Sequence, residues 1–225
     1  MFGLKKKLKK YKKASELKSI AACRSLYEIA FYLVAKKRLQ NFHFVEIGVF
    51  KGDNAVGLKK HLENYLEIDV KFTGFDLFDE IDYLKEHYPD DFNAYNQEEF
   101  PYWEFHSGGH TYANVQQKLL QSFKPNDFSL LKGDTTITFA KFVESGAPKV
   151  DLLYIDGCHD YVVVKADWEN GSQLFLANPN LVVVFDDFSY PGVKTVYEEI
   201  VASGAYSIHP INENQFMVYL SKETI

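Results

Sequence analysis

Cysteines are few in this sequence and long apolar runs are missing, and both absences narrow the class of protein. Cys23 and Cys158 are the two cysteines among 225 residues, and neither stands in a metal-ligand spacing. This argues against a disulfide framework, so we expect a reduced, cytoplasmic protein. No apolar stretch approaches the roughly 18 to 20 residues of a membrane-spanning helix. Residues 1–13 have no apolar core or cleavage site, which argues against a secretory signal.

Basic residues are scarce outside the N-terminus. Seven of the 25 lysines and arginines lie within residues 5–13, and the rest of the chain has 18 basic against 31 acidic residues. Because an acidic body does not attract nucleic acid, we expect no nucleic-acid partner. Two interpretations stay open for the basic tail at residues 1–13. It is either a solvated, frayed end or a contact for an anionic surface or membrane through Lys5–Lys13.

Strand-length apolar runs alternate with segments of helical period along the rest of the chain. This alternation predicts an α/β fold with a doubly wound, mostly parallel, seven-stranded sheet, in one domain spanning residues 14–225. The last two strands, Tyr206–His209 and Gln215–Leu220, are joined by a short polar link, which predicts a C-terminal antiparallel hairpin. The other strands are expected at 43–47, 71–75, 128–131, 150–156 and 181–187, and the helices within 15–39 and at 53–65, 115–123, 136–143, 161–176 and 195–202.

Residues 77–112 interrupt the alternation with an irregular, acidic insert that is crowded with aromatic side chains. An insert of this length at the edge of a ligand site is expected to form a lid or a wall for the acceptor. The alternative is a satellite cluster that packs on the domain. Its histidines, His87, His106 and His110, show no zinc spacing.

Two buried apolar runs end on acidic residues. Val150–Ile155 is followed by Asp156, and Leu181–Phe185 is followed by Asp186 and Asp187. The carboxyl ends of neighbouring parallel strands meet at one edge of the sheet, where open α/β sheets bind their ligands. Clustered carboxylates repel one another unless a cation neutralises them, and all-oxygen ligands suit Mg²⁺ or Mn²⁺. We therefore expect these three aspartates to bind a divalent metal ion.

A histidine follows this acidic edge. His159 lies three residues after Asp156, and the ordinary pKa of its imidazole suits a general base. The alternative is a helix-start residue bonded to the backbone. Asp160 is expected to cap the next helix. Asp187 has two possible roles: it binds the metal ion together with Asp186, or it has only a structural role. We expect Cys158 to be a small buried apolar group rather than a nucleophile.

A turn with two glycines follows the first strand. Glu46–Gly52 reads E-I-G-V-F-K-G, which differs from the G-x-G-x-x-G of dinucleotide-binding turns, so no pyrophosphate cradle is implied. The Glu46 carboxylate suits a cofactor that carries an ammonium group. Asp76, after the second strand, is placed to accept from ribose hydroxyls, and Asp134, after the third, from an adenine amino group. The alternative is a set of ordinary turn glycines and strand-end acids.

Taken in order, the motifs E-x-G-x-x-x-G, F-D, G-D, Y-I-D-G and V-F-D-D resemble a class I S-adenosylmethionine-dependent methyltransferase. More narrowly, the chain from Phe44 to Phe188 resembles the metal-dependent sugar O-methyltransferases of the macrocin type and related small methyltransferases, and Phe75–Asp79 is similar to their F-D-S-F-E/D block. Two departures are Asn54, where many relatives have Ser or Thr, and the segment 79–110, which has no counterpart. The resemblance implies cofactor-binding roles for Glu46, Gly48 and Gly52 beside the methionine part, for Asp76 at the ribose, for Asp134 at the adenine side, and for Asp156. It also implies that Asp156, Asp186 and Asp187 bind Mg²⁺, and that Asp156 and His159 are catalytic, with His159 as the base.

Three functions are compatible with these motifs. The first is an O-methyltransferase that uses S-adenosylmethionine and Mg²⁺ on a hydroxylated small molecule, such as a sugar or glycosylated metabolite. The second acts on a catechol-like planar acceptor. The third is a cofactor-binding module without catalysis, which would need neither the Asp186–Asp187 pair nor His159. The sequence does not fix the acceptor, and a homo-oligomer stays open.

Overall fold

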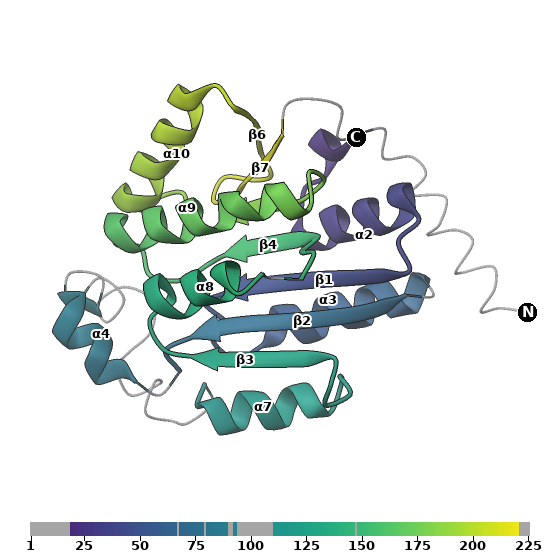
Figure 1. The fold of residues 1–225 in the computed structure, drawn as a ribbon, viewed down its shortest axis with the longest axis horizontal. Coiled ribbons are helices and arrows are strands. Elements are labelled where there is room, and N and C mark those ends of the chain that lie inside the picture. The colour runs from purple at the N-terminus through teal and green to yellow at the C-terminus, as the bar shows by residue number, and fades with distance from the viewer. Residues whose placement is uncertain are drawn as a thin grey trace, which may run out of the picture.

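The computed structural model (Figure 1) describes residues 19–220 apart from 67, 79, 90, 91, 94–109 and 147. Seven strands form one sheet in the order β3-β2-β1-β4-β5-β7-β6. Strands β1 to β5 are parallel, and β7 runs antiparallel to both β5 and β6. The strands are β1 (Asn41–Ile47), β2 (Asp69–Asp76), β3 (Phe128–Lys132), β4 (Leu152–Ile155), β5 (Val182–Phe185), β6 (Tyr206–Pro210) and β7 (Phe216–Leu220). The predicted fold and its C-terminal hairpin are confirmed.

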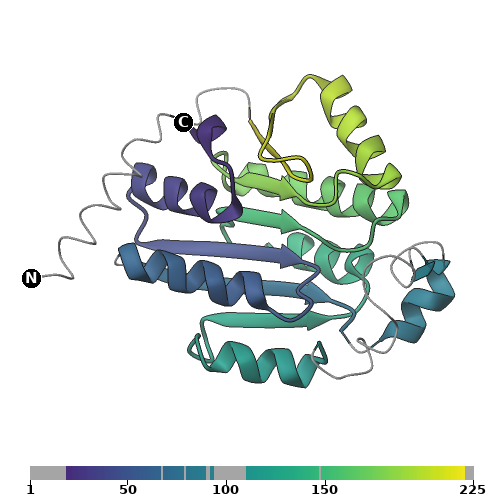
Figure 2. The same cartoon turned by 180° about the vertical axis from the view of Figure 1, so that it is seen from behind.

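Helices cover both faces of this sheet, as the two opposite views show (Figures 1 and 2). One face carries the short η1 (Ile20–Ala22), α2 (Leu26–Lys37), α3 (Asp53–Tyr65) and α7 (Tyr112–Leu120). The other face carries α8 (Thr135–Glu144), α9 (Tyr161–Ala177) and α10 (Pro191–Ser203). A further helix, α4 (Ile81–His87), projects beyond the carboxyl ends of the strands.

The central strands are buried on both faces, which explains their continuous apolar sequences. In β4, Leu152 and Tyr154 belong to the core beneath α2 and α3, whereas Leu153 and Ile155 belong to the core beneath α9 and α10. All four side chains are buried. The strand ends at Ile155, so the carboxylate of Asp156, the next residue, lies at the carboxyl edge of the sheet.

The differences from the predicted elements lie mainly at helix starts and in the insert. The last helix begins at Pro191, four residues before the predicted start. Proline suits the first helical position, because its ring fixes φ at a helical value and the backbone N–H that it lacks would have no hydrogen-bond partner there. The prediction that the insert is irregular is wrong for the segment that forms helix α4. The basic tail with Lys5–Lys13 and residues 94–109 of the insert lie outside the described residues. No helix in the described part of the chain is long and apolar enough to cross a membrane.

Candidate active site

The glycine turn after β1 contacts the acidic loop after β4. Gly48 has φ +83°, and a Cβ atom on it would lie 1.8 Å from the carbonyl oxygen of Asp156 and 2.9 Å from Cα of Gly157. Backbone hydrogen bonds hold both segments in place: the Gly48 N–H donates to Phe75 (2.9 Å) and the Asp156 N–H donates to Ile47 (2.9 Å). Glycine is therefore required at this position, and the two loops form one structural unit.

Glu46 is fully buried beside this turn. Its Oε1 accepts a hydrogen bond from Asn54 Nδ2 at 3.0 Å, whereas Oε2 accepts none from the described residues. Burial raises the pKa of Glu46 well above its ordinary value, and the nearby Asp156 carboxylate adds to this increase. Gly52, the second predicted glycine, has φ +71° and is the N-cap residue of α3. A buried carboxylate with an open acceptor oxygen suits a cationic ligand.

Asp76 connects two loops at the end of β2. Its Oδ2 accepts from the Phe50 N–H (2.7 Å) and its Oδ1 from the Phe78 N–H (2.6 Å). Phe50 and Phe78 have φ values of +48° and +53°, a strained region for bulky residues, so this carboxylate stabilises strained backbone in both loops. Burial raises the pKa of Asp76, although the backbone hydrogen bonds oppose the increase. At the end of the insert, His110 stacks on Phe50 with ring centroids 5.9 Å apart.

Asp134, at the end of β3, is the N-cap residue of α8. Its Oδ1 accepts from the backbone N–H (2.8 Å) and the hydroxyl (2.7 Å) of Thr136. Its Oδ2 accepts from the hydroxyls of Tyr83 and Tyr88, each at 2.9 Å. Burial alone would raise the pKa of Asp134, but the hydrogen bonds from Thr136 and the two tyrosines hold it below its ordinary value.

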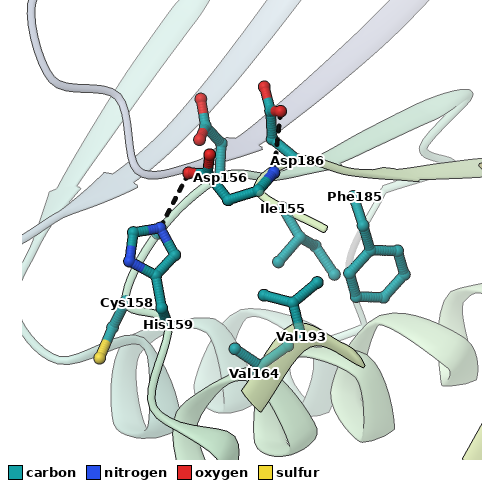
Figure 3. Close-up of a pocket in the computed structure, with 10 residues that line it drawn as sticks. Ile155, Asp156, Cys158, His159, Val164, Phe185, Asp186 and Val193 are labelled. Atoms are coloured by element: carbon teal, nitrogen blue, oxygen red, sulfur yellow. Dashed lines mark hydrogen bonds and ion pairs between the residues drawn. The ribbon is translucent and has the colours of Figure 1, made fainter. Parts of the chain in front are cut away.

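The predicted acidic edge forms where β4 and β5 end side by side. Ile155 pairs with Phe185, so Asp156 and Asp186 follow at adjacent positions, and Figure 3 shows their side chains extending to the same side. Burial, followed by repulsion from Asp186 and Asp187, raises the pKa of Asp156 to about 8. The structure therefore brings the three predicted acids together in a site of concentrated negative charge.

Protein donors orient the carboxylate of Asp186. Its Oδ2 accepts from the hydroxyl of Tyr154 and from Gln215 Nε2 (2.7 Å), and its Oδ1 accepts from the backbone N–H of Asp187 (2.8 Å). Gln215 also donates to the Tyr154 hydroxyl at 3.1 Å. These contacts join β4, β5 and the start of β7, and fix the direction of one member of the acidic edge.

The donor chemistry of the acidic edge matches a hard divalent cation, because all three side chains are carboxylates and positive charge would relieve their repulsion. The described residues contain no group of three Asp, Glu, His or Cys side chains already arranged around a metal position. Asp186 already accepts hydrogen bonds at both of its oxygens, and Asp187 Oδ2 contacts His159 Nε2. A cation would therefore bind through Asp156 and the remaining lone pairs of the other two carboxylates.

His159 lies against this edge, with its ring held on two sides. Its Nε2 is 2.8 Å from Asp187 Oδ2 (Figure 3), and its ring stacks on Tyr190 with centroids 3.8 Å apart and planes inclined by 14°. The side chain is buried, including Nδ1. Asp187 has φ +56°, so this contact also comes from strained backbone. The ring nitrogen on the side of the carboxylates is therefore Nε2, and Asp187 orients it.

Two neighbouring predictions have different outcomes. Asp160 caps α9 as predicted, since its side chain accepts from the Val162 N–H at 2.8 Å. The prediction of a buried Cys158 is wrong: this residue is partly exposed, because it lies in the loop between β4 and α9 and not within a covered strand.

Several residues of this site were missed in the sequence analysis: Tyr83, Tyr88, Tyr154, Tyr190 and Gln215. For one of them a signal was available. Tyr154 precedes Asp156 by two positions, and side chains two apart on a strand face the same side. The others come from segments whose position relative to the sheet has no local sequence signal.

The sheet order, the glycine turn after β1 and acids at the ends of β2, β3, β4 and β5 together define a class I methyltransferase fold. Residues 45–188 match the family model described as a methyltransferase domain, and the chain belongs to this family. The predicted enzyme class, an S-adenosylmethionine-dependent methyltransferase, is confirmed.

Solved structures share this fold at low sequence identity. The O-methyltransferase NovP is 15% identical, with 92% of this chain and 80% of that chain covered and a TM-score of 0.62. CalS11, a TDP-rhamnose 3'-O-methyltransferase of calicheamicin biosynthesis, is 15% identical, with 96% and 94% covered and a TM-score of 0.51. An O-methyltransferase from Bacillus cereus in complex with SAH is 14% identical, with 97% and 90% covered and a TM-score of 0.52. The comparison with curated protein sequences gave no match.

Proposed function

We propose that this protein transfers the methyl group of S-adenosylmethionine to a hydroxyl oxygen of a small molecule, a sugar or glycosylated metabolite, with the assistance of Mg²⁺ or Mn²⁺. The observation that carries the proposal is the contact between the glycine turn and the acidic edge. Because Gly48 touches the backbone of Asp156, a donor bound at the turn lies next to the carboxylates. The sugar O-methyltransferase among proteins of the same fold supports the choice of acceptor.

The cofactor would lie along the carboxyl ends of β1 to β4. In this proposal the open Oε2 of Glu46 receives the ammonium group of the methionine part, while Gly48 and Gly52 allow close approach of the backbone. Asp76 accepts hydrogen bonds from the ribose hydroxyls through the lone pairs that its backbone donors leave open. Asp134 lies at the adenine end.

The acceptor would lie above the acidic edge. Asp156, Asp186 and Asp187 would hold the divalent cation, which lowers the pKa of an acceptor hydroxyl when it is bound. The chain's own residues orient the acceptor and take up its proton. His159 is the proposed proton acceptor, at Nε2, after this nitrogen exchanges its contact with Asp187 for the acceptor hydroxyl. Positioning and deprotonation are the protein's main tasks, because the cofactor supplies the electrophile.

The test is methyl transfer from labelled S-adenosylmethionine to a panel of sugars, sugar nucleotides and catechols, with Mg²⁺ and with EDTA. We expect Mg²⁺-dependent product with a sugar acceptor. Product with catechols alone would favour the planar-acceptor alternative. Cofactor binding without transfer to any acceptor would favour the non-catalytic module.

The roles of the acids are tested by Asp156→Asn and Asp186→Asn. We expect both variants to lose at least about 100-fold in turnover, while their affinity for S-adenosylhomocysteine in isothermal titration stays within a few-fold of the wild type. The matched control is Asp160→Asn, since this neighbouring acid caps α9 by accepting from the Val162 N–H and has no part in the proposed mechanism. Loss of S-adenosylhomocysteine binding in both edge variants would show that the acids serve the cofactor and not the acceptor.

The remaining features of the proposal concern partners and location. We propose a cytoplasmic protein that acts on a small molecule and has no nucleic-acid partner. Contact with an anionic surface through Lys5–Lys13, and assembly into a homo-oligomer, stay predictions.

A further inference from the structure

The described part of the insert is attached to the adenine end of the proposed site by two tyrosines. Helix α4 projects from the carboxyl edge of the sheet near β2 and β3 (Figure 1). Tyr83 on this helix and Tyr88 just after it both donate to Asp134 Oδ2, each at 2.9 Å. An exposed ion pair between Lys132 and Glu80 (3.4 Å) adds little, because such pairs are screened by solvent. The tyrosine pair, Tyr83 and Tyr88, is therefore a principal polar attachment of α4 to the domain.

The carboxylate of Asp134 has no spare capacity in this arrangement. An ionised carboxylate accepts about four hydrogen bonds, two at each oxygen. Thr136 provides both donors at Oδ1, and the tyrosine pair provides both at Oδ2. A further donor can bind Asp134 only if one of these four leaves.

The two oxygens differ in how readily they release a donor. The bonds at Oδ1 form the N-cap of the 10-residue helix α8 and come from a residue two positions away, so their loss would fray this helix. The bonds at Oδ2 come from residues 51 and 46 positions away in an exposed segment. Oδ2 is therefore the oxygen at which a ligand exchanges with the protein.

We infer that the tyrosine pair competes with the adenine amino group of the cofactor for Asp134 Oδ2, and so sets both the affinity for the cofactor and the discrimination between adenine and other purines. This inference rests on the proposed function. In the wild type, each hydrogen bond gained by adenine replaces one from a tyrosine, so the amino group contributes little net affinity. Once the phenols are removed, the same hydrogen bond is a net gain.

The experiment compares two ligands by isothermal titration: S-adenosylhomocysteine and its 6-deamino analogue, in which unsubstituted purine replaces adenine, so that this edge of the ring carries no hydrogen-bond donor. The proteins are the full-length wild type, Tyr83→Phe, Tyr88→Phe and the double variant. The matched control is Tyr219→Phe, which removes a hydroxyl from β7, several strands away from Asp134. Far-UV circular dichroism and thermal melts establish whether each variant is folded. If the double variant does not fold, the two single variants are used for the comparison.

We expect the double variant to bind S-adenosylhomocysteine about fivefold to tenfold more tightly than the wild type, the effect of one unopposed hydrogen bond, with unchanged affinity for the 6-deamino analogue. Unchanged or weaker binding of S-adenosylhomocysteine, or equal tightening of both ligands, would overturn the competition and leave the proposed function intact. If no protein in the series binds S-adenosylhomocysteine, the proposed function fails, and the inference fails with it.

Discussion

The contact between Gly48 and Asp156 predicts a large and specific effect of Gly48→Ala. Two costs combine in this substitution. A left-handed φ such as +83° costs a residue with a side chain about 1–2 kcal/mol. The new Cβ atom also starts 1.8 Å from a backbone oxygen and must move to at least the 3.0 Å that real Cβ atoms keep. Such forced shifts of packed atoms cost about 1–3 kcal/mol, so we expect a total loss of about 2–5 kcal/mol in the free energy of unfolding.

Gly146→Ala separates the two costs. Gly146 has nearly the same φ, +80°, but a Cβ atom there would meet nothing within 4 Å. This control should lose only the conformational cost of about 1–2 kcal/mol. Urea denaturation measures both variants, and titration with S-adenosylhomocysteine measures the site. We expect Gly48→Ala to bind at least about tenfold more weakly and Gly146→Ala to bind like the wild type. Equal losses of stability, with binding intact in both, would refute the contact as the basis of the site.

Two further predictions concern groups near the site and beneath it. Asp167 on α9 is fully buried, and neither of its oxygens accepts a well-formed hydrogen bond from the described residues. Burial raises the pKa of Asp167 to about 8, although the side chain of Thr135 acts to lower it. Because this folded-state pKa lies above the ordinary value of 3.8, its contribution to stability is complete below about pH 4 and is lost as the pH rises towards 8. In Asp167→Asn, the free energy of unfolding should therefore decrease less steeply with pH across this window, by up to about 1 kcal/mol per pH unit. The exposed control Asp69→Asn should keep the slope of the wild type. The same slope in Asp167→Asn and the wild type would contradict a raised pKa for Asp167. Tyr190→Phe should keep near-normal turnover, because the phenylalanine ring preserves the stack on His159. Tyr190→Ala should lower kcat about tenfold or more, with little change in the Kd of S-adenosylhomocysteine. Equal kcat values in the two variants would show that Tyr190 does not position His159.

Much of the fold could be predicted because its signals are local. The run from Leu152 to Ile155 is buried at every position, since both of its faces are covered, and the acids that follow β4 and β5 mark the carboxyl edge. Parallel pairing then brings Asp156 next to Asp186 without further information. The cap at Asp160 follows from the same local chemistry.

The contacts that give these acids their environments could not be predicted. Tyr83 and Tyr88 reach Asp134 from 51 and 46 positions away in the chain, and no local pattern in the insert indicates that these residues meet. The pairing of His159 with Asp187 depends on a left-handed conformation at Asp187, the second residue after β5, and aspartate at that position gives no unambiguous signal of it. Spacing in the sequence predicted which acids meet, but only the packed structure shows which of their oxygens are already bonded.

A crystal structure of the protein with S-adenosylhomocysteine and Mg²⁺ would test most directly whether the donor and the acidic edge form one site. We expect the homocysteine part beside Glu46 and Gly48, and the metal ion within bonding distance of Asp156 and Asp186. A nucleoside bound away from the turn after β1, or an ion bound elsewhere while Asp156 and Asp186 point apart, would contradict the proposed mechanism.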